Sequence, residues 1–222
     1  MPTSERVAAS ITLPMLPSAG WKYAAGAIVA LCAAVLYLVP NRIGVDHAVT
    51  LPLTQAELLL PFWPWTGWIY NAIYLFLLAS FAGMRDLAVA SRFLYACLFT
   101  QMVAATVFVA YPTVFPRDLF PVPVGTAASE AALVELVRNF DRPVNCFPSL
   151  HVSTCVLCLA AYAHEPLRRY RPLAIVASIL LVTSTLTFKQ HYAIDLAGGA
   201  VLGLAAYGTF FRWSRLRLSG GP

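Results

Sequence analysis

The stretch LAIVASILLVTSTLTFKQHYAIDLAGGAVLGLAAYGTFF, residues 173–211, decides the fold of this chain. Two apolar segments, Leu173–Phe188 and Leu196–Phe211, flank a short polar insert, Lys189–Asp195. Neither segment alternates polar and apolar residues as a strand of a membrane barrel would, so both are predicted to be membrane helices. The polar insert is therefore expected at a membrane surface, where the two helices meet.

The composition of the whole chain supports the same conclusion. Hydrophobic residues make up 59% of the chain and charged residues only 11%, whereas charged residues form about a quarter of a soluble domain. We therefore predict an all-α fold, a polytopic membrane bundle of six transmembrane helices. The predicted spans are Tyr23–Val39, Phe62–Gly83, Phe93–Tyr111, Val152–Ala163, Leu173–Phe188 and Leu196–Phe211. The fourth and fifth are shorter than the roughly 20 residues that cross a bilayer, so their ends are expected to extend into the flanking motifs.

The chain is predicted to form a single membrane domain over residues 1–222. Its parts are an N-terminal tail (1–21), a six-helix bundle (22–211) with an outward loop (113–148), and a basic C-terminal tail (212–222). Within the loop, Thr126–Phe140 is predicted to form an interfacial helix, because it carries an apolar stripe made of Leu133, Leu136, Val137 and Phe140. This helix either covers the ends of the spans or acts as a lid for an entering lipid.

The distribution of positive charge predicts the orientation in the membrane. Of the 15 Lys and Arg residues, ten fall on the side of the two termini and five on the other side. The ten are Arg6, Lys22, Arg85, Arg92, Arg168, Arg169, Arg171, Arg212, Arg215 and Arg217, and the five are Arg42, Arg117, Arg138, Arg142 and Lys189. Positive residues favour the cytoplasmic side, so both termini are expected there and the motifs outside. We expect this membrane to be a bacterial plasma membrane. The net charge of +5 is expected to reflect the orientation of the protein in the bilayer and not binding of nucleic acid.

Two histidines and a carboxylate in these outward motifs suggest phosphoryl-transfer chemistry. His191 and Asp195 are four residues apart, so in a helix starting near His191 the carboxylate would hold one imidazole nitrogen and leave the other to attack phosphorus. A plain capping pair is the alternative. His151, in the motif Phe147–His151 at the mouth of the fourth span, is predicted to protonate the leaving group as a general acid.

A phosphate group also needs donors and cations. Ser149 is a candidate donor at the start of a helix, with an ordinary N-cap serine as the alternative. Arg117, Lys189 and Arg142 are candidate cations, with extension of their side chains to the lipid headgroups as the alternative. No two aspartates lie within four residues of each other, so no carboxylate nest for Mg²⁺ is predicted. We expect metal-independent chemistry without a cofactor.

The segments Phe147–His151 and Ser184–Asp195 resemble the second and third motifs of the type 2 phosphatidic acid phosphatase superfamily, Pro-Ser-x-His and Ser-Arg-x5-His-x3-Asp. The resemblance implies that His191 is the nucleophile, Asp195 orients it and His151 assists the leaving group, with Ser184 among the phosphate-binding residues. The chain departs from the pattern twice. Glu135 stands where the lysine of the first motif, Lys-x6-Arg-Pro, is expected, and Thr185 replaces the arginine of the third.

The segment Tyr111–Arg117 adds a likeness to the branch of the superfamily that includes inositol phosphorylceramide synthases, in which Arg117 and Lys189 would replace the missing cations. The resulting hypothesis is a lipid phosphatase or phosphotransferase that acts on a lipid phosphate or diphosphate through a phosphohistidine at the extracytoplasmic interface. Transfer of a phosphoinositol-type headgroup to ceramide or another lipid alcohol is the first alternative. A non-catalytic membrane scaffold or lipid carrier is the second, and a vanadate-dependent oxidase is a remote third.

Overall fold

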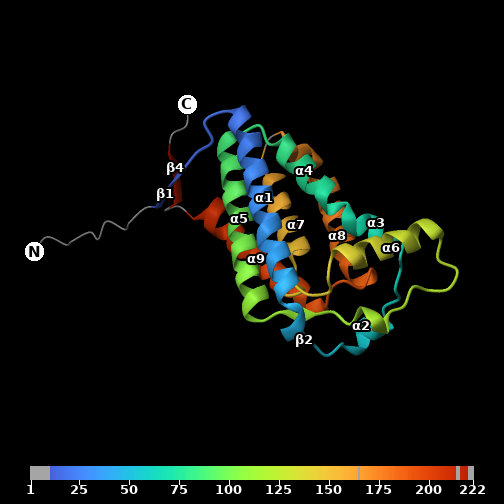
Figure 1. The fold of residues 1–222 in the computed structure, drawn as a ribbon. Helices are drawn as coiled ribbons and strands as arrows, with labels where there is room; N and C mark the ends of the chain where they lie inside the picture. Colours follow the sequence, from blue (N-terminus) through green and yellow to red (C-terminus); the bar gives the residue numbers. More distant parts are fainter. Residues whose placement is uncertain (1–10, 165, 214–215, 220–222) are drawn as a thin grey trace, which may run out of the picture.

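The structure, a computed structural model, describes residues 11–164, 166–213 and 216–219. Its architecture is a bundle of upright helices, and most of the smaller elements lie around one end of it (Figure 1). The helices of the bundle are α1 (Ala19–Ile43), α3 (Thr66–Asn71), α4 (Ile73–Gly83), α5 (Leu87–Ala110), α7 (Leu150–Ala161), α8 (Arg171–Thr187) and α9 (Ala193–Tyr207). A π-helical turn, Gly208–Arg212, continues α9, and a 3-10 turn, Leu167–Tyr170, precedes α8.

Five helical segments in the described part of the chain are long and apolar enough to cross a membrane. They are Ala19–Ile43, Thr66–Gly83, Leu87–Ala110, Leu167–Thr187 and Ala193–Arg212. The expected fourth span corresponds to α7, which is apolar but has only 12 residues. The fold is therefore mostly helical and polytopic as predicted, with five spans of sufficient length and one shorter apolar helix.

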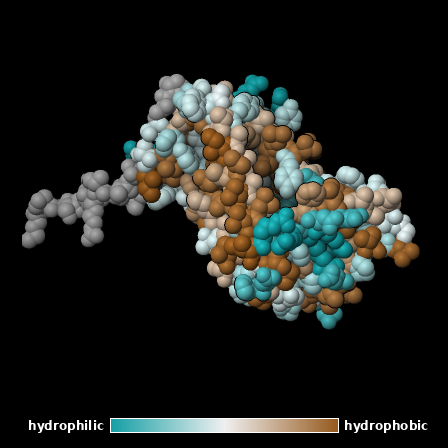
Figure 2. All heavy atoms as spheres, viewed as in Figure 1, coloured by the Kyte–Doolittle hydropathy of each residue, from teal (hydrophilic) through white to brown (hydrophobic). Residues whose placement is uncertain are grey.

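The short helix α7 lies in the middle of the bundle. It packs against α4, α5, α8 and α9, so other helices surround most of its surface. In contrast, α1 packs mainly against α5 and leaves apolar side chains such as Ile28 and Leu31 more than 60% exposed. Figure 2 shows hydrophobic atoms along this side of the bundle. An exposed apolar helix face is expected for a surface that meets lipid.

Two glycines allow α7 and α9 to approach closely. A Cβ atom on Gly199 would lie 2.3 Å from the carbonyl oxygen of Ser149, and one on Gly203 would lie 2.8 Å from the Cβ of Val156. The spacing of these glycines is the GxxxG pattern typical of close helix contacts in membranes, and the structure confirms that contact. As a consequence, the first turns of α7 and α9 lie side by side.

The fold departs from an all-α architecture through two short parallel strand pairs. β1 (Ile11–Pro14) pairs with β4 (Leu216–Ser219), and β2 (Val49–Thr50) pairs with β3 (Thr113–Val114). These strands were not predicted because segments of two to four residues carry no usable alternation. The first pair joins parts of the predicted N-terminal and C-terminal tails, at a distance from β2 and the helix α2 (Gln55–Leu59) (Figure 1).

The predicted interfacial helix is present as α6 (Ala128–Phe140). Its residues Leu133 and Val137 pack against Tyr70 and Phe188, so α6 covers the point where α8 ends. The other two members of the predicted stripe, Leu136 and Phe140, are 54% and 70% exposed. The covering role is therefore evident for one half of the stripe, while the other half faces outward. Two 3-10 turns, Val45–His47 and Arg117–Leu119, complete this end of the molecule.

Candidate active site

The two sequence motifs meet at the first turns of α7 and α9. The backbone N–H of Ser149 donates to the carbonyl oxygen of Asp195 over 3.0 Å, and both residues are fully buried. The close approach that Gly199 permits brings these backbones together. The structure thus joins segments that are more than 40 residues apart in the sequence.

His191 is held by Asp195, as expected, but through a different local geometry. The Nδ1 atom of His191 lies 3.1 Å from Oδ2 of Asp195, and the same carboxylate oxygen accepts the Tyr192 N–H over 2.9 Å. Because α9 begins at Ala193, His191 precedes the helix and does not share a helical face with Asp195. The carboxylate instead folds back over the helix start, where N–H groups lack intrahelical partners. Among the described residues, no hydrogen bond engages Nε2 of His191.

His151, in the first turn of α7, lies beside His191. The centroids of the two imidazole rings are 5.9 Å apart and their planes make an angle of 65°. On its other side, the His151 ring stacks on Tyr70 with centroids 4.2 Å apart. Its Nε2 atom is buried and has no hydrogen-bond partner in the part of the chain that the structure describes. Two imidazoles in this arrangement can act on one bound group from different sides.

The two cations that the sequence favoured, Arg117 and Lys189, are buried at the loop between α8 and α9 that carries His191, which we call the histidine loop. Arg117 is 7% exposed, donates to the carbonyl oxygen of Asp141 over 2.6 Å, and also donates to the Gln190 side chain. Lys189 is 2% exposed and donates to the carbonyl oxygen of Glu57 over 2.8 Å. Neither side chain extends to the surface. The alternative that these two side chains only reach the lipid headgroups therefore does not describe them.

Burial changes the acid–base properties of this end of the molecule. Desolvation lowers the pKa of the Lys189 ammonium, although the charge of Glu57 opposes that change. Desolvation likewise raises the pKa of Asp141, against the opposing effects of a hydrogen bond from Tyr37 and the charge of Arg117. Electrostatic interactions are stronger in such a water-poor environment, which favours recognition of an anion.

The remaining predicted site residues occupy three different surroundings. The hydroxyl of Ser184 donates to the carbonyl oxygen of Leu181 within α8 over 2.7 Å. The Ser149 hydroxyl makes no capping bond to α7 and has no partner among the described residues, so the N-cap alternative does not describe it. Arg142 is exposed and donates to the carbonyl oxygen of Arg42 at the end of α1.

Three site residues were not singled out from the sequence. Glu57 contacts the loop that carries His191, Asp141 holds Arg117, and Tyr70 stacks on His151. The pattern Thr54-x-x-Glu57 is a capping box, which could have predicted the start of α2. No comparable local signal was available for the contacts of the other two.

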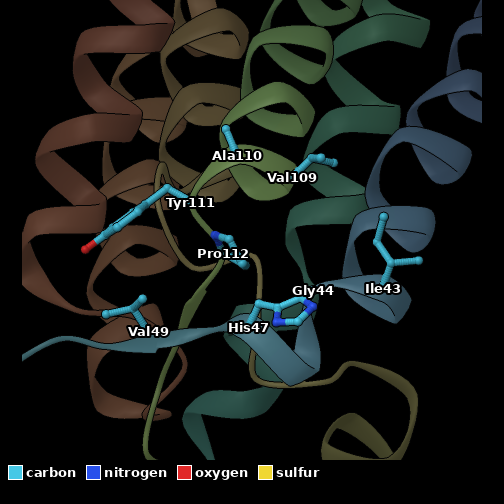
Figure 3. Close-up of a pocket in the computed structure, with 8 residues that line it drawn as sticks. All are labelled: Ile43, Gly44, His47, Val49, Val109, Ala110, Tyr111 and Pro112. Carbon is cyan, nitrogen blue, oxygen red and sulfur yellow. The ribbon is translucent and has the colours of Figure 1, made fainter.

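The described residues line two cavities, and His191 and Lys189 lie at the smaller one. A small cavity is lined by Lys189 and His191 together with Glu57, Leu60, Phe115 and Leu186. A larger one, of about 290 Å³, lies where α1 and α5 end, and Figure 3 shows its lining. Its residues are Ile43, Gly44, His47, Val49, Val109, Ala110, Tyr111 and Pro112. From the sequence, His47 falls on the same predicted outward side as the motifs and could join the site, but in the structure it lines this second cavity and not the first.

The described residues contain no group of three or more His, Cys, Asp or Glu side chains arranged to hold a metal ion. The residues present near His191 are instead histidines, hydroxyls, cations and single carboxylates. Such a set can bind a phosphate group and exchange protons with it.

Comparison with known proteins identifies a family. A family model described as the PAP2 superfamily matches residues 34–209 and covers both motifs. No curated protein and no solved structure gives a significant match.

Proposed function

This chain belongs to the PAP2 superfamily of phosphatases and phosphotransferases and is an integral membrane protein, and from that premise we propose a metal-independent activity on a lipid phosphate or diphosphate. The reaction proceeds through a phosphohistidine on His191. The observation that carries the proposal is the His191–Asp195 pair, in which a fully buried carboxylate holds Nδ1 at 3.1 Å. This contact fixes the tautomer and leaves Nε2 for bond formation.

In the first step, Nε2 of His191 attacks the phosphorus atom and the bond from phosphorus to the lipid oxygen breaks. The departing oxygen takes a proton from His151, whose ring lies beside that of His191. In the second step, water attacks the phosphohistidine, the phosphorus–nitrogen bond breaks, and His151 accepts the proton of the water. Both histidines then return to their starting states.

Arg117 and Lys189 take the place of the cations that the superfamily motifs would supply. Their burial beside the histidine loop supports this role, because desolvated cations stabilise phosphate charge more strongly than exposed ones. Ser149 adds a hydroxyl whose oxygen is buried without a partner in the described structure. To bind phosphate, each cation exchanges one of its present contacts with the protein for a phosphate oxygen.

We also propose a topology of six spans with α7 as the fourth. Its 12 residues are too few to cross a bilayer alone, but α4, α5, α8 and α9 pack against it, and non-helical backbone at membrane depth is tolerated where protein covers it. Both termini then face the cytoplasm of a bacterial cell, and the histidines face outward at the level of the lipid headgroups. A lipid substrate keeps its tails in the bilayer while its phosphate enters from the side.

Transfer of a phosphoinositol-type headgroup to a lipid alcohol is the second candidate. The segment Tyr111–Arg117 favours it, because this segment resembles the synthase branch and its arginine contacts Gln190, next to His191. In that case the alcohol, and not water, attacks the phosphohistidine. An added acceptor lipid would divert the product from free phosphate.

The test measures inorganic phosphate released from phosphatidic acid and from a polyprenyl diphosphate by detergent-purified protein in EDTA. We expect release by the wild type, a loss of at least about 10³-fold in His191→Ala, and an unchanged rate in the control His164→Ala, whose histidine is exposed near Phe211. Equal release by His191→Ala would refute the assigned nucleophile. Phosphate release that occurs without EDTA but stops in its presence would refute metal independence. The absence of both phosphate release and headgroup transfer would favour the scaffold or lipid carrier.

A further inference from the structure

Glu57 contacts both ends of the segment Lys189–Ala193, which leads from α8 into the first residue of α9 and carries His191. We call this segment the Lys189–Ala193 linker. At one end, its backbone carbonyl oxygen accepts the Lys189 ammonium over 2.8 Å. At the other, its Oε1 atom accepts the N–H of Ala193, the first residue of α9, over 2.6 Å. Glu57 comes from α2, more than 130 residues earlier in the chain. One residue of the first outward loop therefore fixes the segment in which His191 lies.

The Glu57 side chain is itself held in one position. Its Oε2 atom accepts both the N–H and the hydroxyl of Thr54, at 2.7 and 2.5 Å, in the capping box of α2. The residue is only 9% exposed. Burial alone would raise the pKa of Glu57, but the hydrogen bonds from Thr54 and Ala193 and the charge of Lys189 lower it below its ordinary value. The carboxylate is therefore ionised at neutral pH and faces the positive end of α9.

The first two available N–H groups at the start of α9 are thus taken by two different carboxylates. Asp195 of the same helix accepts the N–H of Tyr192, and Glu57 of α2 accepts that of Ala193. The N–H groups of the first turn have no partner within the helix, so an acceptor from another segment stabilises the helix start. Ala193 is two residues after His191, so this contact ties the first residue of α9 to α2 close to the imidazole.

We propose that Glu57 is a positioning residue for His191, which acts by fixing the Lys189–Ala193 linker against α2. The proposal rests on the function argued above, since it assumes that His191 is the nucleophile. Glu57 does not attack phosphorus or transfer a proton in this scheme. Both of its carboxylate oxygens already accept hydrogen bonds from protein donors.

The test compares Glu57→Ala, Glu57→Gln and Glu57→Asp with the control Glu135→Ala, which removes an exposed carboxylate from α6. Glu57→Ala removes the acceptor for Ala193, Glu57→Gln keeps an acceptor of the same length without charge, and Glu57→Asp keeps the charge on a shorter side chain. We expect Glu57→Ala and Glu57→Asp to lower kcat about 10- to 100-fold with KM changed less than about threefold. Glu57→Gln is expected to restore most of kcat, and the control to match the wild type.

A second measurement does not depend on turnover. In protein labelled with ¹⁵N-histidine, the Nδ1 proton shared by His191 and Asp195 gives a signal that is assigned by its loss in Asp195→Asn. We expect this signal to shift or broaden in Glu57→Ala and to return in Glu57→Gln. An unchanged signal together with wild-type kcat in Glu57→Ala would overturn the positioning role while leaving the proposed function intact. Lack of turnover in the wild type would instead count against the proposed function, and the histidine signal would still decide the positioning role.

Discussion

The molecule contains a buried lysine at each end of its bundle, and the two make nearly the same local contacts. Lys22, near the start of α1, is 4% exposed, donates to the carbonyl oxygens of Ala82 and Met84, and lies 5.0 Å from the ring centre of Phe81. Lys189 is 2% exposed, donates to one carbonyl oxygen, and lies 4.2 Å from the ring centre of Phe120. Burial, carbonyl contacts and a neighbouring ring therefore do not distinguish a lysine of the candidate site from a structural one.

The neighbours of each lysine make the difference. Met84 and Phe81, beside Lys22, belong to the largest apolar cluster of the described residues, and Lys22 satisfies carbonyl oxygens at the end of α4. Lys189 lines a cavity together with His191 and the carboxylate of Glu57. A cation becomes part of a candidate site when titratable groups that can react or orient surround it. This comparison predicts where substitutions affect turnover and where they affect only stability.

The largest effect is expected from Asp195→Asn. This change keeps the size of the side chain but removes the charge that stabilises the His191 imidazolium, and it permits the wrong tautomer. We expect phosphate release to fall by about 10³- to 10⁴-fold, with a melting temperature in detergent close to that of the wild type. A rate within tenfold of the wild type would contradict the assigned pair.

A smaller effect separates the two lysines directly. Lys189→Met is expected to lower kcat/KM for the lipid phosphate about 10²-fold, mainly through KM, because a phosphate-binding cation is lost. Lys22→Met is expected to leave kcat/KM within about threefold. Both variants should melt at lower temperature, because buried carbonyl oxygens lose a donor. Equal losses of kcat/KM in the two variants would show that Lys189 acts only in folding.

A third prediction concerns the ring that stacks on His151. Tyr70→Phe keeps the ring at 4.2 Å from the imidazole, whereas Tyr70→Leu removes it. We expect Tyr70→Leu to lower kcat about tenfold, because His151 is less well oriented for proton transfer. Tyr70→Phe should stay within about twofold of the wild type. Rates measured across pH test this, and a larger loss in Tyr70→Phe would assign the role to the hydroxyl.

Much of this comparison could be predicted from the sequence, because hydropathy and short motifs are local signals. The apolar segments, the interfacial helix and the contact between His191 and Asp195 all follow from patterns within a few turns of chain. The contact of Glu57 with Ala193 does not, because it joins a loop helix to a helix more than 130 residues later. The sequence left open whether Ser149 caps α7 or faces a phosphate, and only the structure shows that its hydroxyl has no partner among the described residues.

The strand pairs were not predicted, and the expected extension of the short fourth span was wrong because α7 has only 12 residues. Residues Ile11–Pro14 and Leu216–Ser219 pair although they lie near opposite ends of the chain, and neither segment carries a strand pattern of its own. Hydropathy shows that Leu150–Ala161 is apolar, but its burial among four other helices depends on tertiary packing. Such packing is a property of the assembled bundle and not of any one segment.

The smallest expected effect is a dependence of stability on pH that is confined to the end with the histidines. The folded-state pKa of Glu57 is lower than its ordinary value, so the ionised carboxylate adds stability above the ordinary value, and this stability is lost as pH falls through the folded-state value. The wild type should therefore melt higher than Glu57→Gln at neutral pH, by about 2 °C. The difference should shrink as pH falls below 4.5, the ordinary pKa of a glutamate, and disappear below the folded-state pKa.

Glu135→Gln serves as the control for this experiment, because it neutralises an exposed carboxylate on α6. Its melting temperature should follow that of the wild type across the whole pH range. A difference between wild type and Glu57→Gln that persists unchanged in acid would show that the Glu57 charge contributes nothing to the folded state. The amide at position 57 would then be an inferior hydrogen-bonding partner at every pH, and the fixing of α9 by Glu57 would depend on the geometry of its acceptor and not on its charge.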